Sequence, residues 1–206
     1  MNEKTMEIAG LIPLDVNVEL VHLDAGGNVK PIFQENKICR WLLNHGIVNP
    51  LWINRWYAFL LTPFLGFWST SKVYKNLVVD AGKAGVASRI NGAGGEAVFD
   101  KIGWGTGTVA AAAGDTALGA EKAADATTAS TTHVISAATT SRVTTTVTND
   151  TAQDVGTVAA TGSGAITESG VFNAATAGTM LCRQTFSAVN VVNGDSLQFT
   201  WKIKAA

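Results

Sequence analysis

The sequence predicts a mainly β fold, either an antiparallel β-sandwich or a jelly-roll-like barrel, with an N-terminal hairpin and one or two short helices. Three observations support this prediction. Residues 104–206 contain 21 threonines and only 12 charged residues, and threonine favours strands. Turn sequences interrupt this half at short intervals. Its last segment alternates apolar and polar residues, which places Leu197, Phe199 and Trp201 on one face of a strand.

The chain divides into three expected parts. Residues 1–49 should hold a hairpin and a helix, residues 50–97 an aromatic, basic arm and a helix, and residues 98–206 a threonine-rich sandwich. The first and third parts could form one continuous domain. Only 15% of the residues are charged, which is well below the usual quarter. This composition indicates a tightly packed protein whose surface is partly covered by partners.

The N-terminal part begins with a predicted hairpin over residues 14–33. Apolar and polar residues alternate up to Leu23, and the sequence DAGGN at 24–28 is typical of a turn. Pro31 places the returning strand at a sheet edge, because proline has no N–H to donate to a ladder. Residues 34–46 predict a helix with one apolar face, which ends before Pro50.

Residues 50–68 are unusually rich in aromatic side chains. The uninterrupted apolar run is shorter than the roughly 20 residues of a membrane-spanning helix, and Pro63 and Gly66 break it. We consider two interpretations, a docking arm that buries its aromatics on another chain and a core helix packed on the sheet. Mixed Trp, Tyr and Arg are typical anchors of protein interfaces. The candidate interface residues are therefore Trp52, Arg55, Trp56, Tyr57, Phe64, Phe67, Trp68 and, further along the chain, Trp104.

The remaining elements follow in order. Residues 70–90 predict a helix from apolar residues at helical spacing, with Ser69, Thr70 or Ser71 as its N-cap. Turns at 149–150, 162–164, 176–178 and 193–195 then separate the predicted strands. These strands lie near residues 132–136, 142–148, 155–160, 165–173, 179–190 and 196–204.

Charge is unevenly distributed along the chain. The net charge of the whole protein is −1, yet the segment from Lys37 to Arg89 carries +6 and the remainder carries −7. Such asymmetry favours an acidic partner surface for one end of the molecule. Internal pairing between the two parts is the alternative.

The sequence contains no recognisable catalytic or metal-binding pattern. His22, His45 and His133 have no metal-ligand spacing among themselves or with acidic residues. The glycines of residues 105–107 could begin a dinucleotide fingerprint, but Ala110 stands where its third glycine is required. We therefore expect no enzyme activity, no metal, no cofactor and no nucleic-acid partner.

The cysteines and the acidic residues also have structural interpretations. Cys39 and Cys182 lie far apart in apolar surroundings, where buried free thiols are expected. Glu168 lies in the middle of a predicted strand, so its carboxylate needs a partner, either a subunit contact or a buried hydrogen bond. Six other acidic residues of the β half are interpreted as turn formers: Asp115, Glu121, Asp125, Asp150, Asp154 and Asp195.

In two blocks of this sequence, within residues 102–121 and 166–203, the motifs resemble those of the structural proteins of tailed bacteriophage virions. The first block comprises residues 102–108, IGWGTGT, and 114–121, GDTALGAE, followed by threonine-rich strands. The second comprises residues 166–186, ITESGVFNAATAGTMLCRQTF, and 194–203, GDSLQFTWKI. The aromatic segment 50–68 lies outside the resemblance.

The resemblance implies a virion component that is assembled in the host cytoplasm and has no catalytic residues. The first expectation is a capsid decoration, or cement, protein that forms a homo-oligomer, expected to be a trimer. Its partner would be the major capsid protein or another virion protein, with no role for a membrane. A tail or head-fibre adaptor is one alternative. A module that binds host glycans through Trp52, Trp56, Trp68 or Trp104 is another.

Overall fold

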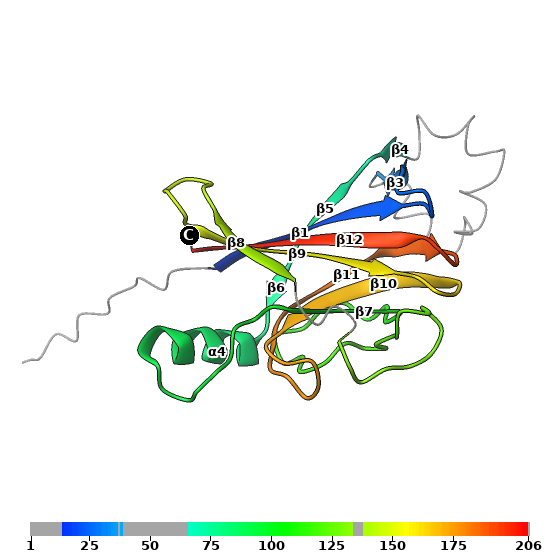
Figure 1. The fold of residues 1–206 in the computed structure, drawn as a ribbon. Coiled ribbons are helices and arrows are strands. Elements are labelled where there is room, and N and C mark those ends of the chain that lie inside the picture. The colour runs from blue at the N-terminus through cyan, green and yellow to red at the C-terminus, as the bar shows by residue number, and fades with distance from the viewer. Residues whose placement is uncertain (1–13, 37, 39–65, 134–137, 206) are drawn as a thin grey trace, which may run out of the picture.

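The computed structural model describes residues 14–36, 38, 66–133 and 138–205, and the two larger antiparallel sheets of this part pack face to face (Figure 1). The predicted mainly β, sandwich-like fold is confirmed. The six-stranded sheet contains β2 (Val29–Lys30), β1 (Leu14–Leu23), β12 (Ser196–Ala205), β9 (Thr151–Ala159) and β8 (Thr139–Val143) in this order, with β5 (Lys72–Lys75) also pairing with β1. The four-stranded sheet contains β6 (Leu77–Val78), β11 (Met180–Val191), β10 (Gly164–Phe172) and β7 (Lys101–Gly105).

The N-terminal hairpin forms as predicted. Asp24 closes its turn, because its carboxylate accepts hydrogen bonds from the backbone N–H groups of Gly26 and Asn28 at 2.8 Å. Gly27 takes a φ of 79°, a conformation that glycine adopts without steric cost. Strand β1 pairs with β12 over its whole length: Leu14 lies opposite Ala205, and Leu23 lies opposite Ser196. The two ends of the described chain therefore share one sheet.

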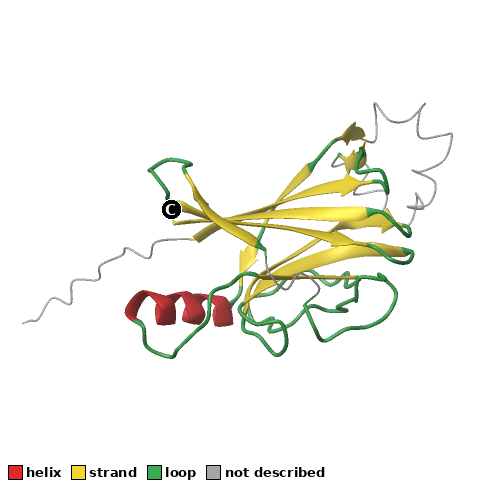
Figure 2. Cartoon of the chain, in the orientation of Figure 1, coloured by secondary structure: helices red, strands yellow, loops and turns green. Residues whose placement is uncertain are grey.

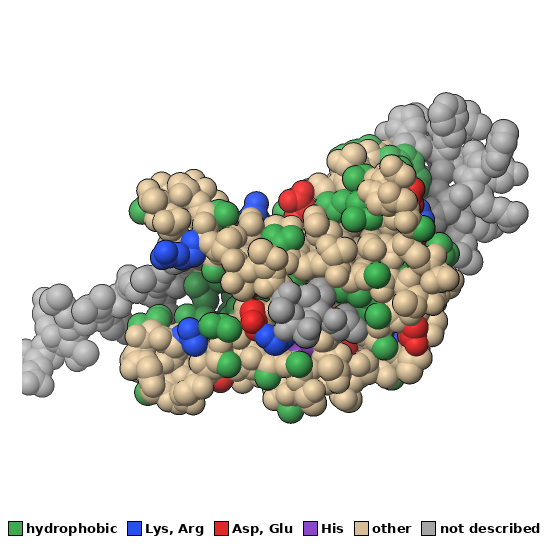
Figure 3. Space-filling model, in the orientation of Figure 1, with side chains coloured by type: hydrophobic (Ala, Val, Ile, Leu, Met, Phe, Trp, Pro, Cys, Tyr) green, Lys and Arg blue, Asp and Glu red, His purple; other side chains and the backbone are tan. Residues whose placement is uncertain are grey.

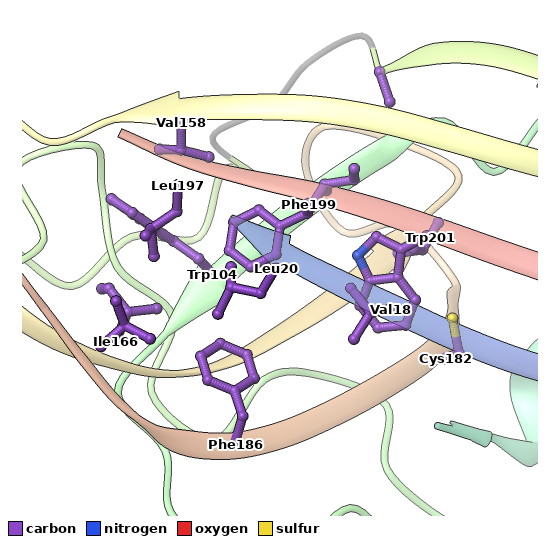
Figure 4. Packing of buried hydrophobic residues seen from close by; sticks show 14 of the residues in the cluster. Val18, Leu20, Trp104, Val158, Ile166, Cys182, Phe186, Leu197, Phe199 and Trp201 are labelled. Carbon is purple, nitrogen blue, oxygen red and sulfur yellow. The ribbon is translucent and has the colours of Figure 1, made fainter. Parts of the chain in front are cut away.

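The C-terminal strand lies inside the sheet, as its alternating pattern predicts. Strand β12 is hydrogen-bonded to β1 on one side and to β9 on the other. Its apolar side chains point into the space between the sheets, where they meet the inner faces of β10 and β11 (Figure 4). The largest fully buried apolar side chains of this core are Trp104, Trp201, Phe199, Leu20, Ile102, Ile166 and Leu197.

A third layer covers the outer face of the four-stranded sheet. It consists of the helix α4 (Asp80–Asn91) and the long chain segments that follow β7 (Figure 2). Gly82 lets α4 approach β11 closely, since a Cβ at this position would collide with the backbone of Leu181. A second, smaller apolar cluster of Val79, Leu118, Phe172 and Met180 fills this layer.

The helix predicted over residues 70–90 is too long at its start. Helix α4 begins at Asp80, and the preceding residues form β5 and β6. Their β-branched and aromatic side chains favour strands, and β1 and β11 offer edges for pairing. The N-cap is Val79, which makes no side-chain capping bond, so the cap predicted at residues 69–71 is wrong.

The strand predicted over residues 142–148 is also misplaced, because β8 ends at Val143. The carboxylate of Asp150 accepts hydrogen bonds from the backbone N–H groups of Thr145, Thr146 and Val147, which closes a turn in place of a strand. These backbone N–H groups are bonded to the Asp150 carboxylate, so they are not available for hydrogen bonds to a neighbouring strand.

Two other predicted elements fall partly on residues that the structure does not describe. The helix predicted over 34–46 starts in residues that belong to strand β3 (Ile32–Glu35), and most of its remainder lies outside the described residues. Of the strand predicted over 132–136, only residues 132 and 133 are described, and Thr132 makes an isolated bridge to Thr176.

Candidate functional site

The structure separates the candidate interface residues into three groups. Trp52, Arg55, Trp56, Tyr57 and Phe64 lie outside the described residues. Phe67 and Trp68 belong to strand β4 (Gly66–Ser69), and their exposed fractions are 61% and 43%. Trp104 is fully buried in the core.

Phe67 and Trp68 lie on a two-stranded ribbon, which β4 forms with β3 (Figure 1). Phe33 is paired with Trp68, and their rings make an edge contact with centroids 5.4 Å apart. Successive residues of a strand point to opposite faces, so Phe67 and Trp68 expose aromatic surface on both faces of the ribbon. Figure 3 shows apolar side chains over this part of the molecule.

The β3–β4 ribbon is joined to the sandwich at its base. The side-chain amide of Gln34 donates a hydrogen bond to the backbone oxygen of Ser71 at 2.9 Å, just before the chain enters β5. Ile32 is buried and belongs to the main core. A two-stranded ribbon is only marginally stable by itself in water. These contacts at its base therefore stabilise the ribbon and fix its orientation relative to the sandwich.

The sequence predicts Trp104 as an interface residue, and its burial in the structure shows that this prediction is wrong. Trp104 is fully buried on β7, and its indole N–H donates a hydrogen bond to the backbone oxygen of Ala123 at 3.0 Å. Trp104 is therefore a core residue and cannot serve as an exposed glycan platform. Its glycine neighbours, Gly103 and Gly105, leave room for the chain segments that cover β7.

Glu168 is the centre of a buried polar network, which we call the Glu168 lock. Its side chain is fully buried on β10. One carboxylate oxygen accepts hydrogen bonds from the backbone N–H groups of Gly107 and Ala120 at 2.8 and 2.7 Å. The other accepts from the N–H of Gly119 at 2.9 Å and from the guanidinium of Arg183 at 2.9 and 2.7 Å. Of the two partners considered from the sequence, the structure provides the buried hydrogen bond.

Arg183 extends the Glu168 lock to the far part of the loop. Its guanidinium also donates to Asp115 at 2.6 Å and to the backbone oxygen of Val109 at 3.1 Å. A hydrogen bond from the backbone N–H of Ala112 lowers the pKa of Asp115, and Arg183 lowers it further. The lock therefore holds both ends and the middle of the loop from residue 106 to residue 121.

Sequence reasoning recognised Glu168 but missed Arg183. Arg183 comes from strand β11 beside Glu168, where Ser169 and Gln184 are paired across the two strands. The available signal is a single charged residue in the otherwise uncharged stretch MLCRQTF. A charge that is buried in such a stretch needs a partner, because an unpaired buried charge is costly.

Three further charged or reactive groups have clear structural roles. Asp195 joins the two turns at one end of the sandwich, since its carboxylate lies 3.0 Å from His22 and 2.8 Å from Lys30. Glu121 lies 2.8 Å from His133. Cys182 is a buried free thiol, as predicted, and burial raises its pKa. Cys39 lies outside the described residues.

The turn-former interpretation holds for four of the six acidic residues. Asp115, Asp125, Asp150 and Asp195 accept hydrogen bonds from backbone N–H groups nearby in the chain. For Glu121 it is wrong, because its side chain pairs with His133. For Asp154 it is wrong as well, because this residue lies inside strand β9 and is 5% exposed.

Within the described ranges, no group of three or more His, Cys, Asp or Glu side chains has a geometry that could hold a metal ion. No helix in the same part of the chain is long and apolar enough to cross a membrane. The chain matches no protein-family model, no curated protein and no solved structure.

Proposed function

We propose that the protein is a structural component of a tailed-phage virion, and that it decorates the capsid by docking its β3–β4 ribbon on the particle. The sequence blocks at 102–121 and 166–186 support the class of protein. The observation that carries the docking surface is the exposure of Phe67 and Trp68 on opposite faces of one ribbon.

Aromatic side chains favour this role for energetic reasons. Burying a large apolar side chain contributes about 1.5–3 kcal/mol, and Trp and Tyr are the commonest anchors of protein interfaces. The ribbon presents its two aromatics on faces that the sandwich leaves open, so a partner cleft could enclose both. Lys75 is exposed on the adjoining strand β5 and would favour an acidic rim on the partner.

The Glu168 lock supports the same proposal, because it belongs to the sandwich that carries the docking ribbon. It joins the two sequence blocks of the resemblance, because Glu168 and Arg183 of the second block bind Gly107, Asp115 and Gly119 of the first. The segments 102–121 and 166–186 are therefore bonded to each other in the fold. A locked outer layer gives the sandwich a rigid body from which a docking ribbon can project.

The docking surface can be tested with purified protein and particles that lack it, prepared from a gene-deletion phage. Replacing Phe67 and Trp68 together by serine should reduce co-sedimentation with the particles at least tenfold, because the anchor side chains are lost. The matched control is Val147→Ser, which removes a comparably exposed apolar side chain (66%) from the β8–β9 turn. Binding that is equal for the double variant and the control would contradict the docking proposal.

The position on the particle needs a separate measurement. Electron microscopy of particles with and without the protein should show its density spread over the head. Density confined to the tail or to one vertex would support the fibre-adaptor alternative. Particles that carry no copy of the protein would contradict a structural role in the virion altogether.

We also propose that the decorating form is a homo-oligomer, with a trimer as the expected state. The low charge fraction of the chain supports this, because uncharged surface favours association. Light scattering at increasing protein concentration measures the state in solution. A stable monomer at high concentration, together with isolated copies on the particle, would contradict it.

A further inference from the structure

Polar side chains gather inside the sandwich, on the inner side of the six-stranded sheet. Asn76 lies where the chain crosses from β5 to β6, and its backbone N–H donates to the oxygen of Val16 at 2.8 Å. Its side-chain nitrogen and oxygen are buried and have no hydrogen-bond partner among the described residues. Trp201 is fully buried on β12, and its indole N–H likewise has no partner there.

Asp154 adds a carboxyl group to this region. It lies directly opposite Trp201 in the β9–β12 ladder, and directly opposed residues point to the same face of a sheet. Its side chain faces inwards with Val158, and the residue is 5% exposed. Within the described part of the chain, its carboxyl group makes no hydrogen bond.

The three side chains belong to one end of the interior. Val18 of β1 pairs with Trp201, while Val16, two residues earlier on the same face, is bonded to the backbone of Asn76. Asn76 and Trp201 therefore flank β1 on its two sides. Figure 4 shows the indole of Trp201 beside Val18, with Cys182 entering the same space from the facing sheet.

Leaving these groups dry would be costly, because a buried donor or acceptor without a partner loses its hydration and gains nothing in return. Their chemistry is complementary to water. An indole N–H donates to a water oxygen, a carboxyl oxygen accepts from a water hydrogen, and a carboxamide does both. Buried waters typically make about three such hydrogen bonds to otherwise unsatisfied groups.

We propose that this end of the sandwich interior is a hydration site, where ordered water is hydrogen-bonded to the Trp201 indole and the Asp154 carboxyl group and continues to the Asn76 carboxamide. The site is separate from the docking ribbon and from the Glu168 lock. It gives hydrogen-bond partners to the polar groups of Trp201, Asp154 and Asn76 inside a largely apolar core.

Nuclear magnetic resonance detects such water directly. The indole N–H resonance of Trp201 is assigned by its loss in Trp201→Phe. In the wild-type protein it should show a cross-peak to water with the sign of a long-lived bound molecule. The indole N–H of Trp104, which is bonded to Ala123, should show none. A folded protein whose Trp201 N–H shows no water cross-peak would overturn the proposal.

Variants of Asp154 test whether the carboxyl group holds the water. Asp154→Asn keeps an acceptor and should keep the cross-peak, whereas Asp154→Leu should abolish it. Thr157→Leu, an exposed position on the same strand, is the control and should leave it unchanged. If Asp154→Leu does not fold, Asn76→Leu provides the second test and should weaken the cross-peak. Cross-peaks that persist unchanged in the folded leucine variants would contradict the assigned ligands.

Discussion

Glu168 and Asp154 are two buried carboxylates in very different surroundings. Glu168 accepts five hydrogen bonds from three backbone N–H groups and one guanidinium. Asp154 is nearly as buried, yet among the described residues it has no hydrogen-bond donor. Burial, followed by the nearby Asp100 carboxylate, raises the pKa of Asp154 to about 7. The comparison shows that burial alone does not decide whether a carboxylate stabilises the folded protein, because the hydrogen-bond donors around it also matter.

The difference follows from the face of the sheet on which each residue lies. Glu168 points to the outer face of the four-stranded sheet, where a loop supplies backbone N–H groups that are not used in a ladder. Asp154 points towards the other sheet, whose backbone N–H groups are already bonded between strands. A loop can therefore satisfy a buried charge, whereas two packed sheets cannot without help from water.

The largest effect is expected when Glu168 is replaced by alanine. This change leaves Arg183 buried with only Asp115 and Val109 as partners, and leaves three backbone N–H groups unpaired. Breaking a buried ion pair from one side costs about 3–5 kcal/mol. Urea unfolding should show a loss of this size in the free energy of unfolding. A loss below about 1 kcal/mol would mean that the loop does not depend on the Glu168 lock.

Replacing Asp154 by asparagine should instead raise the free energy of unfolding at neutral and higher pH. The pKa of Asp154 in the folded protein lies above its ordinary value of 3.8, so the folded state binds the proton more tightly. The stabilisation that comes from this bound proton is fully present below about pH 4 and is lost as the pH rises through 7. The full linkage corresponds to about 4 kcal/mol, which is an upper bound.

The measurement is the melting temperature of both proteins between pH 4 and pH 8. The wild-type protein should lose stability across this range relative to Asp154→Asn, which cannot ionise at this position. The titratable groups that act on Asp154 are the carboxylate of Asp100, which pairs with Lys101, and the buried thiol of Cys182. Parallel pH profiles for the two proteins would show that Asp154 keeps an ordinary pKa.

The sequence was sufficient to predict the fold class and the positions of the last strands. Alternation in 196–204 and the turn at 193–195 are local signals, and β12 lies where they indicate. The Asp150 turn is just as local, but threonines suited to a strand precede it. The two signals conflict there, and the side-chain hydrogen bonds of Asp150 decide the outcome.

The candidate site was predictable only in part, because the layers of the fold are a long-range property. Glu168 could be recognised from its strand context, but its backbone partners lie 48 to 61 residues away in the chain, and Arg183 lies 15 residues away on another strand. Trp104 and Trp68 are both strand tryptophans with a glycine within two residues. Trp104 is buried in the main core and Trp68 is exposed on a ribbon, a difference that depends on which segments cover each strand.

The smallest of these effects tests how closely the loop fits the Glu168 lock, with Gly107→Ala. A Cβ at this position would lie only 2.7 Å from the carboxyl carbon of Glu168. The carboxylate cannot turn away, because Gly119, Ala120 and Arg183 hold it from other sides. Overpacking of this kind typically costs about 1–3 kcal/mol, and we expect a loss in this range in the free energy of unfolding.

Gly114→Ala is the control for Gly107→Ala, since it lies in the same loop and an added Cβ would meet nothing within 4 Å. It should change stability by less than about 0.5 kcal/mol. Hydrogen exchange would locate the effect, because the amides of Gly119 and Ala120 donate directly to Glu168 and should exchange faster in Gly107→Ala alone. Equal exchange in the two variants would mean that the carboxylate adapts to the extra methyl group, and that the loop fits the lock less tightly than these contacts indicate.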